Sequence, residues 1–285
     1  MLDVYVFNVG EGQCIFLYPY ENNGEYCTLI DCGDTLTFRP VDVIKQLLPK
    51  NNEGRPVLKS LILTNYDEDH FSGICDLNNK TKIQTINFSH NLTCNEIEGC
   101  KEQSTIALRS MLDLKKLYTA DIIDWNPPYT KRCFALNKSD IQDPISGKWD
   151  TNNLSQLVFI THNGYTMCFP GDLEQKGWKT MLDKYPEVKQ LLQQTKLFIA
   201  SHHGRDDGYV EEVFNYCSPD CIIISDGPIQ YGTQDHMAAK YANHIKGNGI
   251  LFDGTLRKVL TTRCDGHILV RIDNLGNSTF YKTDF

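Results

Sequence analysis

The chain has 285 residues, of which 41% are hydrophobic and 22% are charged, so it is long enough to bury a sizeable core as ordinary globular proteins do. Its net charge is −8, from 28 Lys and Arg against 36 Asp and Glu. This balance argues against long-range attraction to a nucleic-acid backbone, although it leaves room for a local basic rim.

Neither a membrane span nor a disulfide framework is expected. No run approaches the ~20 apolar residues that cross a bilayer, and Asp3 stands where a secretory signal peptide would carry positive charge. The eleven cysteines form no CxxC pair, and several, such as Cys14 and Cys168, sit in apolar runs where a reduced thiol packs as a small apolar group. We therefore expect a cytoplasmic protein with no membrane partner.

The predicted elements are mostly short strands with helices between them. Three strands, at 4–7, 13–18 and 26–31, are separated by turns rich in Gly and Asn. A helix at 40–48 and strands at 57–63 and 83–88 follow. From residue 154 the pattern predicts strands at 157–161, 165–169, 197–200 and 221–225, helices at 174–185, 209–216 and 237–245, and closing strands.

Residues 90–150 differ in character from the rest of the chain. A predicted helix at 103–118 is followed by a stretch rich in Pro, Asn, Asp and Lys, which is typical of an insertion on the rim of a core. No internal repeat divides the chain. We predict a single α+β domain over 1–285, with two sheets, helices outside them, and an insertion at about 90–150.

Acidic and imidazole side chains follow three of the predicted strands, at the point where each strand ends. The runs span 64–70, 169–174 and 201–204, and they contain Asp67, Asp69, His70, Asp172, His202 and His203. If these strands lie side by side, their ends bring the side chains to one edge of the fold. Carboxylate oxygens and imidazole nitrogens that converge on a point suit a divalent cation. The sequence therefore predicts a metal-dependent hydrolase.

Each of these residues also has a simpler interpretation. Asp69 and Asp172 stand where a helix N-cap belongs, and the two histidines could be an ordinary surface pair. Asp172 could equally place one oxygen on each of two cations. Because adjacent side chains of an extended chain point in opposite directions, one of His202 and His203 would bind metal while the other faces the substrate or supports a ligand.

Two more residues are candidates at the ends of predicted elements. His236 lies at a loop-to-helix junction, where it would supply a last nitrogen ligand unless it is a plain surface histidine. Asp31 ends an apolar strand two residues before Gly33. It would accept hydrogen bonds from the metal-site loops and so orient the ligands, with simple turn chemistry as the alternative.

Together these motifs resemble the metallo-β-lactamase superfamily. Within it, the chain looks most similar to the branch that contains the hydrolase domain of the ComEC DNA-uptake proteins and the phosphorylcholine esterases. The matching segments occur in the family's order, at 7–14, 29–33, 64–70, 152–155 before 156–174, 201–204, and 222–225 before Tyr231 and Gly232. The resemblance implies an αββα sandwich with a metal site at the sheet edges.

The resemblance also implies ligand sets for one or two divalent ions, Zn²⁺ or Mn²⁺. Asp69, His70, Asp172 and one later histidine would hold one ion, whereas Asp67, Asp172 and one of the twin histidines would hold part of the other. The family's loop usually begins with His, and this chain has Asn65 there, whose amide is a weaker ligand. The Asn-Asn-Leu-Ser run fills the place of another family His, so Asn65, Asn153 and Ser155 would support the ligands rather than bind metal.

Hydrolysis is the activity that the resemblance implies. A cation lowers the pKa of bound water toward ~7, and Asp67 or Asp172 would orient that water. The cation and an imidazole, of His202 or His236, would stabilise charge on the substrate's oxygens. The leading hypothesis is a phosphodiesterase or nuclease acting on nucleic acid. The alternatives are a hydrolase of small phosphodiesters or esters, and a degenerate, non-catalytic scaffold with a protein partner, which Asn65 motivates.

Overall fold

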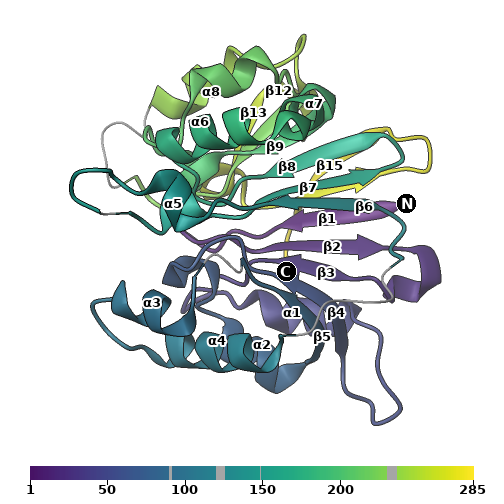
Figure 1. The fold of residues 1–285 in the computed structure, drawn as a ribbon. Coiled ribbons are helices and arrows are strands. Elements are labelled where there is room, and N and C mark those ends of the chain that lie inside the picture. The colour runs from purple at the N-terminus through teal and green to yellow at the C-terminus, as the bar shows by residue number, and fades with distance from the viewer. Residues whose placement is uncertain (90–91, 120–125, 148, 230–235) are drawn as a thin grey trace.

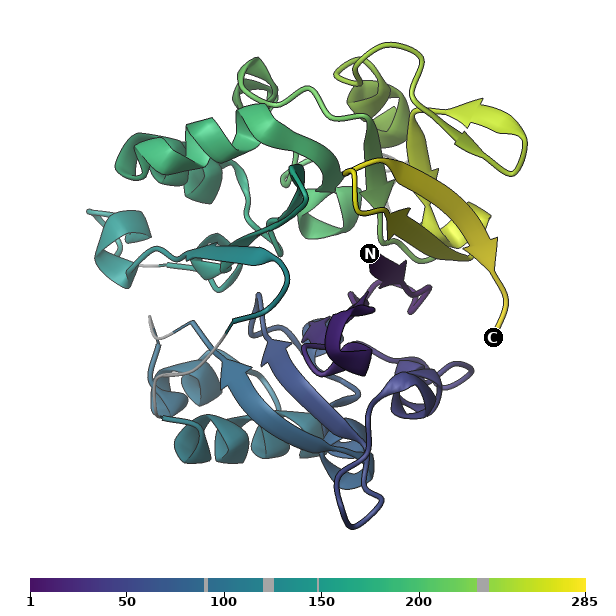
Figure 2. The same cartoon turned by 90° about the vertical axis from the view of Figure 1, so that its right-hand side faces the viewer.

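Two β-sheets face each other, and helices cover the outer face of each (Figures 1 and 2). The computed structural model describes residues 1–89, 92–119, 126–147, 149–229 and 236–285. Helices α1, α2 and α4 lie along one sheet, and α6, α7 and α8 lie along the other (Figure 1). This four-layer order is the αββα sandwich that the resemblance implied.

The first sheet has seven strands in the order β15-β14-β1-β2-β3-β4-β5. Its strands are β1 (Leu2–Val6), β2 (Ile15–Pro19), β3 (Thr28–Ile30), β4 (Val57–Ile62), β5 (Lys82–Asn87), β14 (His267–Ile272) and β15 (Ser278–Thr283). Strands β3, β4 and β5 run parallel to one another, whereas the other neighbours pair antiparallel.

The second sheet has six strands in the order β13-β10-β9-β8-β7-β6. Its strands are β6 (Thr130–Phe134), β7 (Leu157–His162), β8 (Tyr165–Phe169), β9 (Thr195–Ile199), β10 (Cys221–Ile224) and β13 (Val259–Thr261), and a separate hairpin joins β11 (Ile250–Phe252) to β12 (Thr255–Arg257). Strands β8, β9, β10 and β13 are parallel. Because parallel strands end at the same edge, the loops that follow β8 and β9 lie together.

The helices are short and amphipathic. They are α1 (Pro40–Leu47), α2 (Ile74–Lys80), α3 (Cys94–Gly99), α4 (Ile106–Leu117), α5 (Lys138–Ile141), α6 (Gln175–Lys184), α7 (Pro186–Gln194), α8 (Met237–Ala242) and α9 (Thr262–Asp265), with 3₁₀ turns η1 (Glu21–Gly24), η2 (Glu68–His70), η3 (Asn152–Leu154), η4 (Ser201–Gly204) and η5 (Glu211–Asn215). Among the described residues, no helix combines the length and the apolar character that crossing a membrane requires.

The core has two parts because each sheet buries both of its faces. One part lies between the sheets and includes Val4, Ile62, Val158 and Ile199, and the other lies between the sheets and the helices. All four residues of β10 are buried, as expected for a parallel strand covered on both sides. Each fully buried Val, Leu or Ile contributes roughly 1.5–3 kcal/mol of transfer free energy, so the site's loops extend from a rigid frame.

Most predicted elements are present, and the differences have physical causes. Residues 211–215 form a single 3₁₀ turn where a helix at 209–216 was predicted, and Val213 is its one buried residue. Strand β6 was not predicted, because this edge strand is largely polar and Phe134 is its one buried residue. The region 90–150 thus supplies the edge strand β6 as well as α4, which packs on α2.

Candidate metal centre

Four candidate ligands meet where loops from the two sheets come together. Asp69 and His70 lie in η2 after β4, Asp172 follows β8, and His203 lies in η4 after β9. One ligand atom of each residue lies within 4.8 Å of the corresponding atoms of the other three. The topology therefore brings together residues that are up to 134 positions apart in the sequence, from 69 to 203.

The distances between these ligand atoms fit a single cation. His70 Nε2 lies 3.0 Å from Asp172 Oδ2, and His203 Nε2 lies 3.3 Å from Asp69 Oδ2 and 3.5 Å from Asp172 Oδ1. Zinc bonds of about 2.0–2.2 Å in a tetrahedron place ligand atoms about 3.3–3.6 Å apart. Two oxygens and two imidazole nitrogens form a donor set that Zn²⁺ accepts, as do other first-row divalent ions.

The atoms that face the centre of this group have no hydrogen-bond partner. Three buried atoms make no hydrogen bond: His70 Nε2, His203 Nε2 and Asp172 Oδ1. They lack a partner even though the imidazole nitrogens lie 3.0–3.5 Å from carboxylate oxygens of the group. Buried polar atoms are almost always paired, so a set of orphans aimed at one point indicates that a ligand completes the site. A divalent cation satisfies all of them at once.

Hydrogen bonds on the far side of each imidazole fix its orientation. His70 Nδ1 donates to Asp31 Oδ2 over 2.8 Å, and His203 Nδ1 donates to the carbonyl oxygen of Ser225 over 3.0 Å. Because Nδ1 carries the proton in both rings, Nε2 offers its lone pair to the centre. Asp31 is fully buried and also accepts from the backbone N–H of Thr64, which ties the loops after β3 and β4 together.

The charges in the group shift one another's pKa values. Burial alone would raise the pKa of Asp172, but the rings of His70 and His203 outweigh it and hold that pKa below its ordinary range. Burial opposes protonation of His70, yet the carboxylates of Asp172 and Asp31 raise its pKa well above the usual value. Without a cation, the His70 imidazole therefore holds a proton that a bound metal would displace.

The loop that carries the twin histidines adopts an uncommon backbone conformation. His202 and His203 have φ values of 50° and 53°, in the left-handed region that costs a non-Gly residue about 1 kcal/mol or more. The turn separates the two rings, whose centroids lie 6.3 Å apart. Only His203 points into the four-ligand group.

His202 faces a different set of side chains. Its Nδ1 lies 2.8 Å from Asp207 Oδ1 and 3.6 Å from Glu174 Oε1, which forms a second group with metal-like spacing. However, the Arg205 guanidinium donates to His202 Nε2 over 3.2 Å, so Nε2 is the acceptor and Nδ1 carries the proton. A protonated Nδ1 suits the neighbouring carboxylates better than it suits a cation.

Asp67 and Asn65 lie beside the four-ligand group without joining it. Asp67 Oδ1 contacts the ammonium of Lys101 and accepts from Thr151 Oγ1 over 3.2 Å. Asn65 Oδ1 accepts the backbone N–H of Asp67 over 3.2 Å, and its Nδ2 donates to Asn152. In the part of the chain that the structure describes, Asp67 belongs to neither group with metal-like spacing.

The remaining predicted residues support the site or lie outside it. Ser155 Oγ accepts the backbone N–H of Asp172 over 3.0 Å, and Asn153 Oδ1 accepts that of Gly177 at the start of α6. His236 is exposed and precedes α8, apart from both groups. Tyr231 and Gly232 of the resemblance lie outside the described residues.

Sequence reasoning missed Lys101, Asp207 and Glu174 as partners of the site. Lys101 comes from the polar 90–150 region, where nothing in the sequence marks which lysine turns inward. Asp207 follows the twin histidines by only four residues, and Glu174 follows Asp172 by two. The one signal in the sequence that could have identified Asp207 and Glu174 is that both are acidic and lie within a few residues of the motifs.

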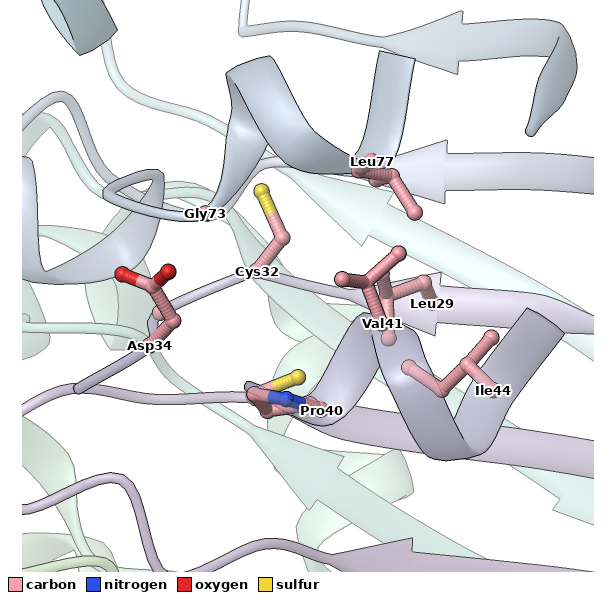
Figure 3. A pocket seen from close by; sticks show the side chains of 10 residues that line it. Leu29, Cys32, Asp34, Pro40, Val41, Ile44, Gly73 and Leu77 are labelled. Carbon is pink, nitrogen blue, oxygen red and sulfur yellow. The ribbon is translucent and has the colours of Figure 1, made fainter. Parts of the chain in front are cut away.

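A small apolar cavity lies behind the centre and is part of the packing. Its volume is about 10 Å³, close to that of a single water. Leu29, Val41, Ile44 and Leu77 line it together with Cys32 (Figure 3). Burial raises the pKa of the Cys32 thiol far above its ordinary value, so this cysteine stays protonated and inert.

No protein-family model and no curated protein sequence matches this chain. Solved structures do match it. YhfI from Bacillus subtilis, described as a metallo-β-lactamase fold protein, aligns with a TM-score of 0.50 and 11% identity over 98% of this chain and 99% of its own. The chain has the metallo-β-lactamase fold.

Other proteins with the metallo-β-lactamase layer order align equally well. Unliganded yeast PDE1 gives a TM-score of 0.50 with 11% identity, over 91% of this chain and 96% of its own. CmlA from Streptomyces venezuelae, a diiron β-hydroxylase, gives 0.50 with 10% identity, over 94% of this chain and 54% of its own. At such low identity these likenesses show the fold alone, and they do not single out the ComEC-type branch.

Proposed function

We propose that this protein is a metal-dependent hydrolase that cleaves phosphodiesters, with the ion held by Asp69, His70, Asp172 and His203. The observation that carries the proposal is the group of four ligands, three of them buried, with three unpaired atoms aimed at one point. A divalent ion bound there would activate water at neutral pH and draw charge from the substrate's oxygens. The likeness to yeast PDE1 is one of fold, so the assignment rests on the chemistry of the site.

The side chains around the centre have defined roles in this proposal. Asp172 is buried and its pKa lies below the ordinary range, so it stays ionised and can accept a hydrogen bond from the attacking water. His202, oriented by Asp207, stands next to the ligand His203 and lies close enough to Asp172 for their charges to interact. We assign His202 to contact with the substrate rather than to the ion.

A phosphodiester is favoured because cationic side chains border the centre. Lys101 reaches Asp67 beside η2, and Arg205 lies against His202 in the loop after η4. Such groups stabilise the charge of phosphoryl oxygens. They form a local basic rim on a chain whose net charge is −8. That net charge favours small phosphodiesters over long nucleic acids as substrates, since no extended basic face is required.

The test is a substrate panel with zinc- or manganese-loaded protein. Bis(4-nitrophenyl) phosphate, a dinucleotide, and single- and double-stranded DNA are incubated with wild type and with Asp172→Ala. We expect wild type to cleave the small phosphodiesters, and Asp172→Ala to lose at least about 10²-fold in kcat/KM, because an ion ligand and the group that accepts from water disappear together. Equal cleavage by both proteins, or none by wild type, contradicts the proposal.

A further inference from the structure

The carboxylate of Asp67 is neutralised from within the protein. Lys101 extends its ammonium to Asp67 Oδ1, and Thr151 Oγ1 donates to the same oxygen over 3.2 Å. The Lys101 side chain is 19% exposed, so its charge is largely removed from solvent. Lys101, within the 90–150 region, and Thr151, just after it, therefore hold this one acid.

Asp67 lies between two loops that carry the centre. It directly precedes η2, and thus stands two residues, or at most about 7 Å of backbone, from the ligand Asp69. Thr151 directly precedes η3, and Ser155 just after η3 holds the backbone of Asp172. The ammonium of Lys101 is accordingly held at the residue that directly precedes the ligand-bearing turn η2.

The residues around Asp67 do not fit a second metal ion. The amide oxygen of Asn65 is already committed to backbone N–H groups, and its nitrogen faces Asn152. Over the described residues, no group with metal-like spacing contains Asp67. A divalent ion there would also have to displace the ammonium of Lys101, because two positive charges at that distance repel each other.

We propose that the Lys101 ammonium is the second positive centre of this site, in place of a second metal ion, and that it binds an oxyanion of the substrate. An ammonium carries three N–H donors, and Asp67 Oδ1 takes one of them. The remaining donors would be available to a phosphoryl oxygen of a bound substrate. The nature of the substrate rests on the proposed function, whereas the metal count and the binding of a simple oxyanion do not.

A purely structural ion pair is the competing explanation. Lys101 would then only fasten the 90–150 region to η2. The chain offers a matched control in Lys138, which pairs with Glu96 within the same region. Removing either lysine breaks one ion pair, but of the two only Lys101 pairs with a residue next to the ligand-bearing turn η2.

The experiment compares wild type with Lys101→Met, Lys101→Gln, Lys101→Arg and Lys138→Met. Each protein is loaded with Zn²⁺, its metal content is measured by elemental analysis, and its affinity for inorganic phosphate is measured by calorimetry. We expect one metal equivalent in every protein. Phosphate affinity should fall about tenfold or more in both neutral Lys101 variants, stay near wild type in Lys101→Arg, and be unchanged in Lys138→Met.

Two results would overturn the proposal. One is a second metal equivalent in wild type, and the other is equal phosphate affinity in the neutral Lys101 variants and Lys138→Met. Two neutral variants are used in case one of them folds poorly, and the Tm of each variant shows whether it is folded. If phosphate binding follows the expected pattern while no phosphodiester is cleaved, the proposed function fails and the assignment of Lys101 stands.

Discussion

Hydrogen-bond direction distinguishes the two neighbouring histidines at the scale of single residues. His203 donates from Nδ1 to the carbonyl oxygen of Ser225 and so leaves Nε2 free for an ion. His202 accepts at Nε2 from Arg205 and directs Nδ1 to Asp207. Proximity alone would make both histidines ligands, since each stands beside carboxylates. The proton positions assign the ion to His203.

Asp31→Asn tests how far a neighbour fixes a ligand. The amide would present a donor to His70 Nδ1 or to Thr64 Oγ1, both of which now donate to the carboxylate. His70 would lose the tautomer that offers Nε2 to the ion. We expect Zn²⁺ affinity to fall about 10- to 100-fold in a calorimetric titration. Asp113→Asn, an exposed change on α4, is the control. Unchanged affinity in Asp31→Asn would count against this role.

At the level of elements, His267 anchors β14 to the segment that follows β1. Its Nδ1 accepts the backbone N–H of Asn8, and its ring packs 4.2 Å from that of Phe38 and 5.5 Å from that of Phe285. Burial lowers the pKa of His267, and the nearby Asp284 only partly offsets this effect. Protonation would place a hydrogen against the Asn8 donor.

The contribution of His267 to the stability of the metal-free protein should therefore be lost in mild acid. A histidine whose pKa is lower in the folded protein than in the unfolded chain stabilises the fold at a pH above the unfolded pKa of about 6.5. As the pH falls below that value, the unfolded chain binds the proton more readily, so this contribution is lost. Between pH 7.5 and 5, we expect the Tm of wild type to drop further than that of His267→Gln, whose side chain does not titrate. His236→Gln, at an exposed position, should behave as wild type does. Equal Tm losses in His267→Gln and wild type would refute the prediction.

The sequence could predict elements whose apolar pattern is strong, and the loops that follow them. The runs before Asp67, Asp172 and His202 are buried strands in the structure, which is why the ligand-bearing loops were recognisable. Strand β6 was missed because an edge strand needs no apolar outer face. Lys101 was missed because its partner depends on tertiary contacts, which local pattern does not encode.

At the scale of the whole molecule, the centre joins the two halves of the sandwich. Asp69 and His70 follow a strand of one sheet, whereas Asp172 and His203 follow strands of the other. An ion bound by all four would link the sheets and stabilise the native state over the unfolded chain. At 100 times Kd the gain is about 2.7 kcal/mol, or roughly 4–5 °C in Tm for a chain of 285 residues.

Zinc titration of metal-free wild type, His203→Ala and His202→Ala, followed by calorimetry and thermal melting, tests the central claim most directly. We expect one equivalent and a raised Tm for wild type and for His202→Ala, and loss of both in His203→Ala. Loss of the ion in His202→Ala with retention in His203→Ala, or no zinc bound to wild type, would contradict it.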